Sequence, residues 1–249
     1  MRYLGGKART ARRIVNAMLA DAGDVKDSTF IEPFLGGGSI MAEVAKRHAF
    51  KYQIAADALD LTTEYWDAIK SGWRPPAHVS REEYLAAKRS RGAELPAPLR
   101  AHYAFSCSFG GKFWGGYAAD ETRPNCGPAH YAGHAGRKDA QLRDIIQHVR
   151  FLTQDYRDTA RLAASGDVLY CDPPYSGTTA YSATPGFSHD EFWSAMQESA
   201  SAGVLVYVSE YEVPQRVPHS VIFSRQVQLA VSRSSDRTVV DKLFRIHTD

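Results

Sequence analysis

The chain has 249 residues, which suits one large α/β domain or a catalytic domain with an inserted subdomain. Hydrophobic residues make up 44% and charged residues 23%, and no apolar run approaches the ~20 residues that cross a bilayer, so we expect a soluble protein. The N-terminus carries no apolar signal segment, which predicts a cytoplasmic location. The net charge of +2 is too small to indicate a nucleic-acid partner by itself.

Strands and helices alternate in the first part of the chain. Apolar residues at helical spacing predict a helix over 8–20, directly after the glycine turn at Gly5–Lys7. The further elements expected are a buried strand over 29–34, a glycine loop over 36–38, a helix over 39–46, a strand over 52–57 and a helix over 61–70. Such alternation predicts a parallel, doubly wound α/β sheet.

The segment over 73–134 breaks this alternation with glycine-rich, aromatic and irregular sequence, so we predict an inserted domain there. The catalytic domain would then comprise residues 1–72 and 135–249. Between Trp73 and Arg150 there are 12 Lys and Arg against 7 Asp and Glu, so the middle of the chain is its basic part. A solvated surface without a partner would explain this charge equally simply.

Alternation resumes after the insert and ends in a predicted antiparallel hairpin. We expect a helix over 139–148, a strand over 168–171, a helix over 189–202, a strand over 204–209, and hairpin strands around 227–231 and 242–246. The three cysteines are odd in number and irregularly spaced, which predicts free thiols. Cys107, Cys126, His130 and His134 have spacings that a metal could use, but no paired knuckle is present, and we expect no metal.

The tetrapeptide Asp172-Pro173-Pro174-Tyr175 follows a buried strand, at the sheet edge where open α/β folds bind ligands. A carboxylate and a backbone carbonyl can accept the two N–H bonds of an amino group and favour its nucleophilic geometry. Asp172 and the Pro173 carbonyl would supply these acceptors, and the Tyr175 ring would stack on a base. A plain capped turn is the structural alternative. We therefore predict amino-group chemistry at this turn.

A second set of residues indicates an adenosine-containing cofactor. The loop over 34–39 lies between a strand and a helix, and its glycines let a ligand approach the backbone. Asp57 ends the next strand, where an acidic side chain can accept hydrogen bonds from ribose hydroxyls. The dinucleotide pattern lacks its third glycine, which favours S-adenosylmethionine over a pyrophosphate cofactor. Glu32 and Asp57 could also be simple strand-end caps.

These motifs together resemble the Dam-like, alpha-group DNA adenine-N6 methyltransferases, in a phage or prophage type. The resembling stretches are Tyr3-Leu4-Gly5-Gly6-Lys7, residues 30–39, Asp172-Pro173-Pro174-Tyr175, and the C-terminal stretches over 231–235 and 240–243. The resemblance implies a Rossmann-like S-adenosylmethionine-dependent methyltransferase fold with an inserted target-recognition domain. It also implies double-stranded DNA as partner, flipping of the target adenine, direct in-line methyl transfer and a link to restriction-modification.

The resemblance carries roles onto individual residues. Catalysis is expected from Asp172, Pro173, Pro174 and Tyr175. Cofactor contacts are expected from Tyr3, Gly6, Lys7, Glu32, Pro33, Phe34, Gly36, Gly38, Asp57, Asp155 and Asp172, with Phe151 as a looser match. DNA contacts are expected from Lys112, Phe113, Trp114, Tyr117, Arg123, Arg137 and Lys138. The family resemblance does not specify a recognition sequence, and we expect a monomer or weak dimer.

Three alternatives stay open from the sequence. Some RNA base amino-methyltransferases share the Asp-Pro-Pro-Tyr turn, and a non-catalytic DNA-binding module could have kept the fold. The six aromatics from Tyr103 to Tyr117 could insert into a distorted duplex or form a small core of the insert. In a mixed arrangement, Tyr103, Phe105 and Phe109 would be buried while Lys112, Phe113 and Trp114 stay outside.

Overall fold

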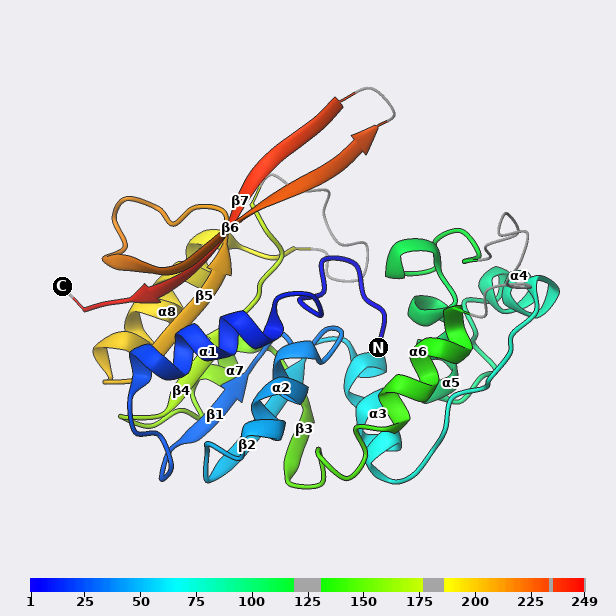
Figure 1. Cartoon of the computed structure of the whole chain (residues 1–249), viewed down its shortest axis with the longest axis horizontal. Coiled ribbons are helices and arrows are strands. Elements are labelled where there is room, and N and C mark those ends of the chain that lie inside the picture. Colours follow the sequence, from blue (N-terminus) through cyan, green and yellow to red (C-terminus); the bar gives the residue numbers. More distant parts are fainter. Residues whose placement is uncertain (119–130, 177–185, 233–234, 249) are drawn as a thin grey trace.

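The computed structural model describes residues 1–118, 131–176, 186–232 and 235–248 (Figure 1). Its helices are α1 (Ala11–Ala22), α2 (Ser39–Arg47), α3 (Asp60–Lys70), α4 (Arg81–Arg89), α5 (Ala97–Ala101), α6 (Tyr131–Ala140), α7 (Tyr156–Ala160) and α8 (His189–Ser201), with the single turns η1 (His102–Ser106) and η2 (Phe109–Gly111). Its strands are β1 (Thr29–Glu32), β2 (Tyr52–Asp57), β3 (Val149–Thr153), β4 (Val168–Cys171), β5 (Leu205–Glu210), β6 (His219–Ser232) and β7 (Ser235–Ile246). None of the helices described is long and apolar enough to cross a membrane.

The strands form one seven-stranded sheet in the order β3-β2-β1-β4-β5-β7-β6. The strands from β3 to β5 pair in parallel, and the antiparallel hairpin β6–β7 extends the sheet beyond β5. The predicted doubly wound, Rossmann-like α/β fold with a C-terminal hairpin is therefore confirmed. Strand order reverses between β1 and β4, and the crevice beyond the carboxyl ends of such strands is where open α/β sheets bind ligands.

Helices cover both faces of the sheet, because side chains alternate between its faces along each buried strand. Val168 and Tyr170 of β4 pack in a core with apolar residues of α1 and α2. Leu169 and Cys171 of the same strand pack in a second core with residues of α7 and α8. Both cores lie directly behind the carboxyl ends of the strands, so the loops that leave β1 and β4 start from a rigid base.

The described part of the predicted insert forms a separate hydrophobic core, on the far side of α3 from the sheet (Figure 1). Tyr84 and Phe105 are fully buried in it, and Trp114 is only 5% exposed. Phe109, by contrast, is 74% exposed. The expectation that Trp114 stays outside while Phe109 is buried is therefore wrong, because the indole packs near the Tyr84 ring. The aromatic stretch builds a core rather than a row of exposed rings.

One element near the insert was placed wrongly by the sequence pattern. The predicted helix over 139–148 is instead the end of α6 followed by turns, and the chain then enters β3, a strand that we did not predict. In these turns, the hydrogen bonds from Leu142 N to Asp139 O and from Ile145 N to Leu142 O span three residues, where an α-helix has bonds that span four. Ile146 is fully buried beside α3, so its burial in tertiary packing outweighs the helical periodicity of the segment.

Candidate active site

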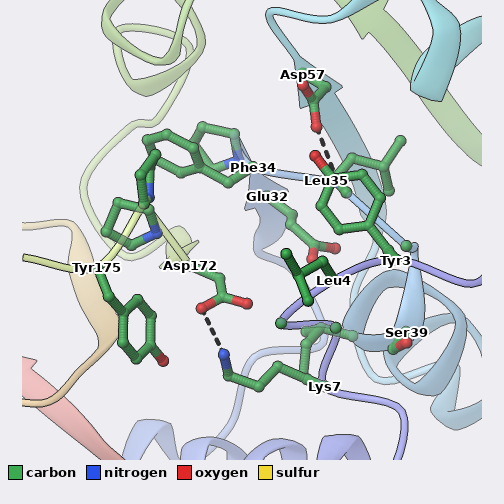
Figure 2. A pocket seen from close by; sticks show the side chains of 18 of the residues that line it. Tyr3, Leu4, Lys7, Glu32, Phe34, Leu35, Ser39, Asp57, Asp172 and Tyr175 are labelled. Atoms are coloured by element: carbon green, nitrogen blue, oxygen red, sulfur yellow. Dashed lines mark hydrogen bonds and ion pairs between the residues drawn. The ribbon is translucent and has the colours of Figure 1, made fainter. Parts of the chain in front are cut away.

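A cavity of about 1070 Å³ lies at the carboxyl ends of β1, β2, β4 and β5, where the topology places a ligand crevice. Its wall includes all four residues of the Asp172–Tyr175 turn. Of the expected cofactor residues, those that also line it are Tyr3, Gly6, Lys7, Glu32, Pro33, Phe34, Gly36, Asp57 and Asp155. Gly38 does not line the cavity, although its neighbours Gly37 and Ser39 do. The fold thus gathers segments from both ends of the chain around one cavity (Figure 2).

The glycine loop after β1 is fastened to the end of β2. The Leu35 amide donates to the Ala56 carbonyl at 2.8 Å, and the Gly36 amide donates to Asp57 Oδ2 at 2.8 Å. Asp57 Oδ1 accepts a further bond from the Leu59 amide at 3.0 Å. Burial nevertheless raises the pKa of Asp57 to about 6, since these bonds offset only part of the desolvation. The carboxylate is fixed in position and remains on the cavity wall.

The N-terminal segment lies between this loop and the insert. The Tyr3 ring is so close to Gly36 that a Cβ there would be 3.1 Å from Tyr3 Cε1. The same ring stacks on Phe105 of the insert at 4.9 Å between centroids, and the Leu4 amide donates to the Gly111 carbonyl at 3.0 Å. A shift of the insert relative to the sheet would therefore move Tyr3 within the cavity.

Lys7 and Asp172 form an ion pair on the wall of the cavity. Lys7 Nζ lies 2.7 Å from Asp172 Oδ1, and Figure 2 shows the ammonium directed at the carboxylate. Burial raises the pKa of Asp172, and the charge and hydrogen bond of Lys7 counter part of that rise. Lys7 thus favours the ionised carboxylate, which is the form that can accept hydrogen bonds from an amino group.

Two further buried acids lie at the cavity, Glu32 on its wall and Glu210 next to the wall residue Tyr211. Glu32 Oε2 has no hydrogen-bond partner among the described residues, and burial together with the charge of Asp172 raises the pKa of Glu32 well above its ordinary value. Burial raises the pKa of Glu210 to about 7, although the Tyr211 and Ser176 amides both donate to its carboxylate. An unpartnered carboxyl oxygen and a surplus of acids suit a cationic ligand, and S-adenosylmethionine carries a sulfonium and an ammonium.

Tyr175 is held from three sides. Its hydroxyl donates to Asp241 Oδ1 at 2.9 Å, and the Tyr211 ring meets it edge-on at 4.7 Å between centroids. Lys7 Nζ lies 4.7 Å from the centre of its ring. Asp241, Tyr211 and Glu210 were not predicted as site residues. Asp241 had a sequence signal, because it belongs to the C-terminal stretch that resembles the family.

Aromatic residues form the opposite wall of the cavity. Phe34 stacks on Tyr156 at 5.4 Å and meets Phe187 edge-on at 6.0 Å. Asp155 is beside them, but its carboxylate is already bound by the Arg157 guanidinium at 2.8 Å. Phe151 packs against the core near α3 and does not line the cavity. The looser match at Phe151 therefore receives no support from its position.

The expected DNA-binding residues divide by exposure. Lys112, Arg137 and Lys138 are exposed, and Phe113 is partly exposed. Trp114 is in the insert core, and the Tyr117 hydroxyl donates to the Val79 carbonyl at 2.6 Å, so both have structural roles. Arg123 lies outside the described residues, as do Cys126 and His130 of the metal alternative. Within the described part of the chain, no group of three or more His, Cys, Asp and Glu side chains could hold a metal.

Sequence comparisons give a consistent picture. The sequence model of the D12 class N6 adenine-specific DNA methyltransferase family matches residues 3–93 and 130–244. The retron Ec67 DNA adenine methylase of Escherichia coli is 36% identical over 66 residues, which are 25% of this chain and 23% of that protein. The type II methyltransferase M1.LlaDCHI of Lactococcus lactis subsp. cremoris is 22% identical over 240 residues, 86% of this chain and 81% of that protein. The match thus spans less than a quarter of the retron protein.

Similar solved structures are more distant. The rRNA methyltransferase aviRa from Streptomyces viridochromogenes has a TM-score of 0.46 and 17% identity, and the match covers 96% of this chain and 84% of that chain. TrmN from Thermus thermophilus has a TM-score of 0.41 and 12% identity, covering 96% of this chain and 49% of that chain.

Proposed function

This chain belongs to the D12 class N6 adenine-specific DNA methyltransferase family, and from that premise we propose that it transfers a methyl group from S-adenosylmethionine to the N6 amino group of adenine in double-stranded DNA. One observation carries the proposal. Asp172, the acid of the Asp-Pro-Pro-Tyr turn, lies on the wall of the cavity and is paired with Lys7 at 2.7 Å.

The chain's own residues fit the cofactor. Asp57 would accept hydrogen bonds from the ribose hydroxyls, because its carboxylate is fixed by the Gly36 and Leu59 amides. The unpartnered oxygen of Glu32 would accept from the ammonium of the methionine part. Phe34 and Tyr156 offer aromatic surface for the adenine ring. When bound, the cofactor supplies an electrophilic methyl group on a positively charged sulfur.

Asp172 and the Pro173 carbonyl would hold the target amino group. Two acceptors on its two N–H bonds direct the nitrogen lone pair out of the ring, which raises its nucleophilicity. Methyl transfer would form the N–C bond as the S–C bond breaks, which leaves the cofactor as a neutral thioether. The methylated nitrogen would then lose one proton, which the Asp172 carboxylate could accept. Lys7 keeps Asp172 ionised before the reaction, and the Tyr175 ring would stack on the adenine.

The target adenine must leave the duplex to reach Asp172, since the acid is on the wall of a crevice and not on the surface. We propose the insert over 73–134 as the target-recognition domain, beside the catalytic domain over 1–72 and 135–249. Lys112, Arg137 and Lys138 would contact phosphates, and their exposure supports this role.

The test is methyl transfer from a labelled cofactor to DNA by the wild type and by Asp172→Ala. We expect the variant to lose about 10²- to 10⁴-fold in turnover, because it removes the acceptor of the amino protons. Glu43→Ala, which removes an ion pair with Arg47 within α2 and outside the cavity lining, is the control and should keep wild-type turnover. Full activity of Asp172→Ala would contradict the mechanism.

An RNA substrate forms the second arm of the same assay. Transfer to RNA but not to DNA would replace DNA by RNA in the proposal, and cofactor binding without transfer to either would indicate a non-catalytic module. A cytoplasmic location, a monomeric or weakly dimeric state, a phage or prophage origin and a partner restriction enzyme also remain predictions. Mapping of methylated adenines in a host that expresses the protein would identify the recognition sequence.

A further inference from the structure

A hydrogen bond ties the catalytic turn to the C-terminal hairpin, and the Tyr175 hydroxyl that makes it also interacts with the Asp172 carboxylate. The Tyr175 hydroxyl donates to Asp241 Oδ1 at 2.9 Å across 66 residues of sequence. Burial and the nearby carboxylates of Asp172 and Asp241 raise the pKa of Tyr175 well above its ordinary value, so the phenol remains the proton donor. This bond fixes the one polar atom of the ring that the proposed function uses for stacking.

Asp241 lies at the point of the hairpin where the pairing of β7 with β5 ends. Strand β7 pairs with β5 from Ile246 to Lys242, and the pairing stops one residue before Asp241. From there on, the described part of β7 pairs with β6 alone, and Figure 1 shows the two strands extending away from the sheet. Arg225 stands opposite Asp241 on β6, and both residues line the cavity. A movement of the free part of the hairpin would therefore act on Asp241 first.

We propose that Asp241 is a positioning residue that holds the Tyr175 ring for stacking on the target adenine and so couples the hairpin to the catalytic turn. The inference rests on the proposed function, because it names how one residue of that site is held. The hydroxyl oxygen of a tyrosine lies on the χ2 axis, so this hydrogen bond fixes the direction in which the Tyr175 side chain points, while the edge-on Tyr211 ring packs against its plane. A hydrogen bond to a carboxylate is about twice as strong as one between neutral groups, which makes Asp241 an effective anchor.

The first measurements are kcat for DNA methylation and the Kd of S-adenosylmethionine in Asp241→Ala and Asp241→Asn. We expect Asp241→Ala to lower kcat about 10-fold with an unchanged cofactor Kd, the size expected when a hydrogen bond to a charged group is lost. Asp241→Asn keeps an acceptor oxygen and should stay within about threefold of the wild type. The flipping signal of 2-aminopurine at the target position should fall in Asp241→Ala alone.

Asp21 provides a matched control. The Tyr207 hydroxyl donates to Asp21 Oδ2 at 2.8 Å, a bond of the same kind behind the sheet core and outside the cavity. Asp21→Ala should therefore keep wild-type kcat. If both alanine variants lower kcat equally, the loss reflects general destabilisation and the inference is wrong.

A double-variant cycle tests whether Asp241 acts through Tyr175. In a Tyr175→Phe background, Asp241→Ala should cost nothing further, because the hydroxyl that it anchors is already absent. An equal cost in both backgrounds would overturn the inference. Tyr175→Phe keeps the ring and removes the bond, so it also carries the test if Asp241→Ala does not fold.

A spectroscopic measurement separates this inference from the proposed function. The Cζ signal of ¹³C-labelled tyrosine, assigned to Tyr175 through Tyr175→Phe, should shift in Asp241→Ala and stay in place in Asp21→Ala. If the signal shifts while the wild type methylates no DNA, the proposed function fails and the anchoring bond stands. An unchanged signal would refute the anchoring bond, whatever the activity.

Discussion

At the scale of single residues, the buried acids in and beside the cavity have raised pKa values. Burial raises the pKa of Asp57 to about 6 and that of Glu210 to about 7, whereas Lys7 partly offsets the rise at Asp172. Among the described residues, Asp57 and Glu210 are desolvated without a salt bridge, in contrast to Asp172, which pairs with Lys7. A cationic cofactor would supply that missing charge, so cofactor binding and deprotonation should be linked.

This linkage predicts a pH-dependent cofactor affinity. Below about pH 6 Asp57 binds a proton, and the proton must leave before the carboxylate can accept both ribose hydroxyls. Affinity for S-adenosylmethionine should therefore be about 10-fold lower at pH 5 than at pH 7, measured by isothermal titration calorimetry. Asp57→Asn should bind more weakly at pH 7 and lack the step near pH 6.

Glu210→Gln separates the two titrations in this experiment. The Glu210 carboxyl has its pKa at about 7, so this substitution should remove any step near pH 7 and leave the step near pH 6 unchanged. A step near pH 6 that persists in Asp57→Asn would show that another group is responsible.

At the scale of elements, the turn from β1 into α2 depends on a glycine with two separate constraints. Gly38 has φ 68° and ψ 22°, the left-handed region, at the N-cap of α2. A Cβ there would also lie 2.5 Å from Trp66 Cε2 of α3. The close approach of the loop to α3 keeps Phe34 to Gly36 facing the cavity.

Gly38→Ala should accordingly lower the free energy of unfolding by about 2–4 kcal/mol, the sum of backbone strain and collision with a buried ring. Urea denaturation would measure the change. Gly110→Ala is the matched control for strain, because Gly110 has φ 65° and ψ 8° and its Cβ would meet no atom within 4 Å. It should cost only about 1 kcal/mol. Equal losses of unfolding free energy in both variants would show that the Trp66 ring moves aside without a measurable loss of stability.

The strands of the sheet could largely be predicted from the sequence, whereas the contacts between distant segments could not. Strand β2 and strand β4 have the predicted limits, because their apolar runs are bounded by an acid or by prolines. The burial of Trp114 depends on packing against α4, which no local pattern encodes. The contact of Tyr175 with Asp241 likewise depends on the strand order that brings β7 beside β5.

At the scale of the whole molecule, exposed basic residues occur at two separate places on the fold. Exposed basic residues Lys112, Arg137 and Lys138 belong to the predicted insert and to α6. A second exposed basic set, Lys26, Lys46 and Lys51, lies at the opposite edge, where β1 and β2 begin and α2 ends. The two sets carry equal charge, so a comparison of their variants shows whether the position of a charge or the net charge alone governs duplex binding.

The two sets give a prediction for duplex binding. Each phosphate neutralised by a Lys or Arg contributes about 0.9 to the slope of log K against log salt concentration. Replacing Lys112, Arg137 and Lys138 by alanine should lower the magnitude of this slope by up to about 2.7, measured by fluorescence anisotropy between 50 and 200 mM salt, a range that resolves such slopes. Alanines at Lys26, Lys46 and Lys51 should leave the slope unchanged, because this edge faces away from the cavity. If the second set lowered the slope as much as the first, binding would follow net charge alone, and the insert would lose its proposed role in holding the duplex.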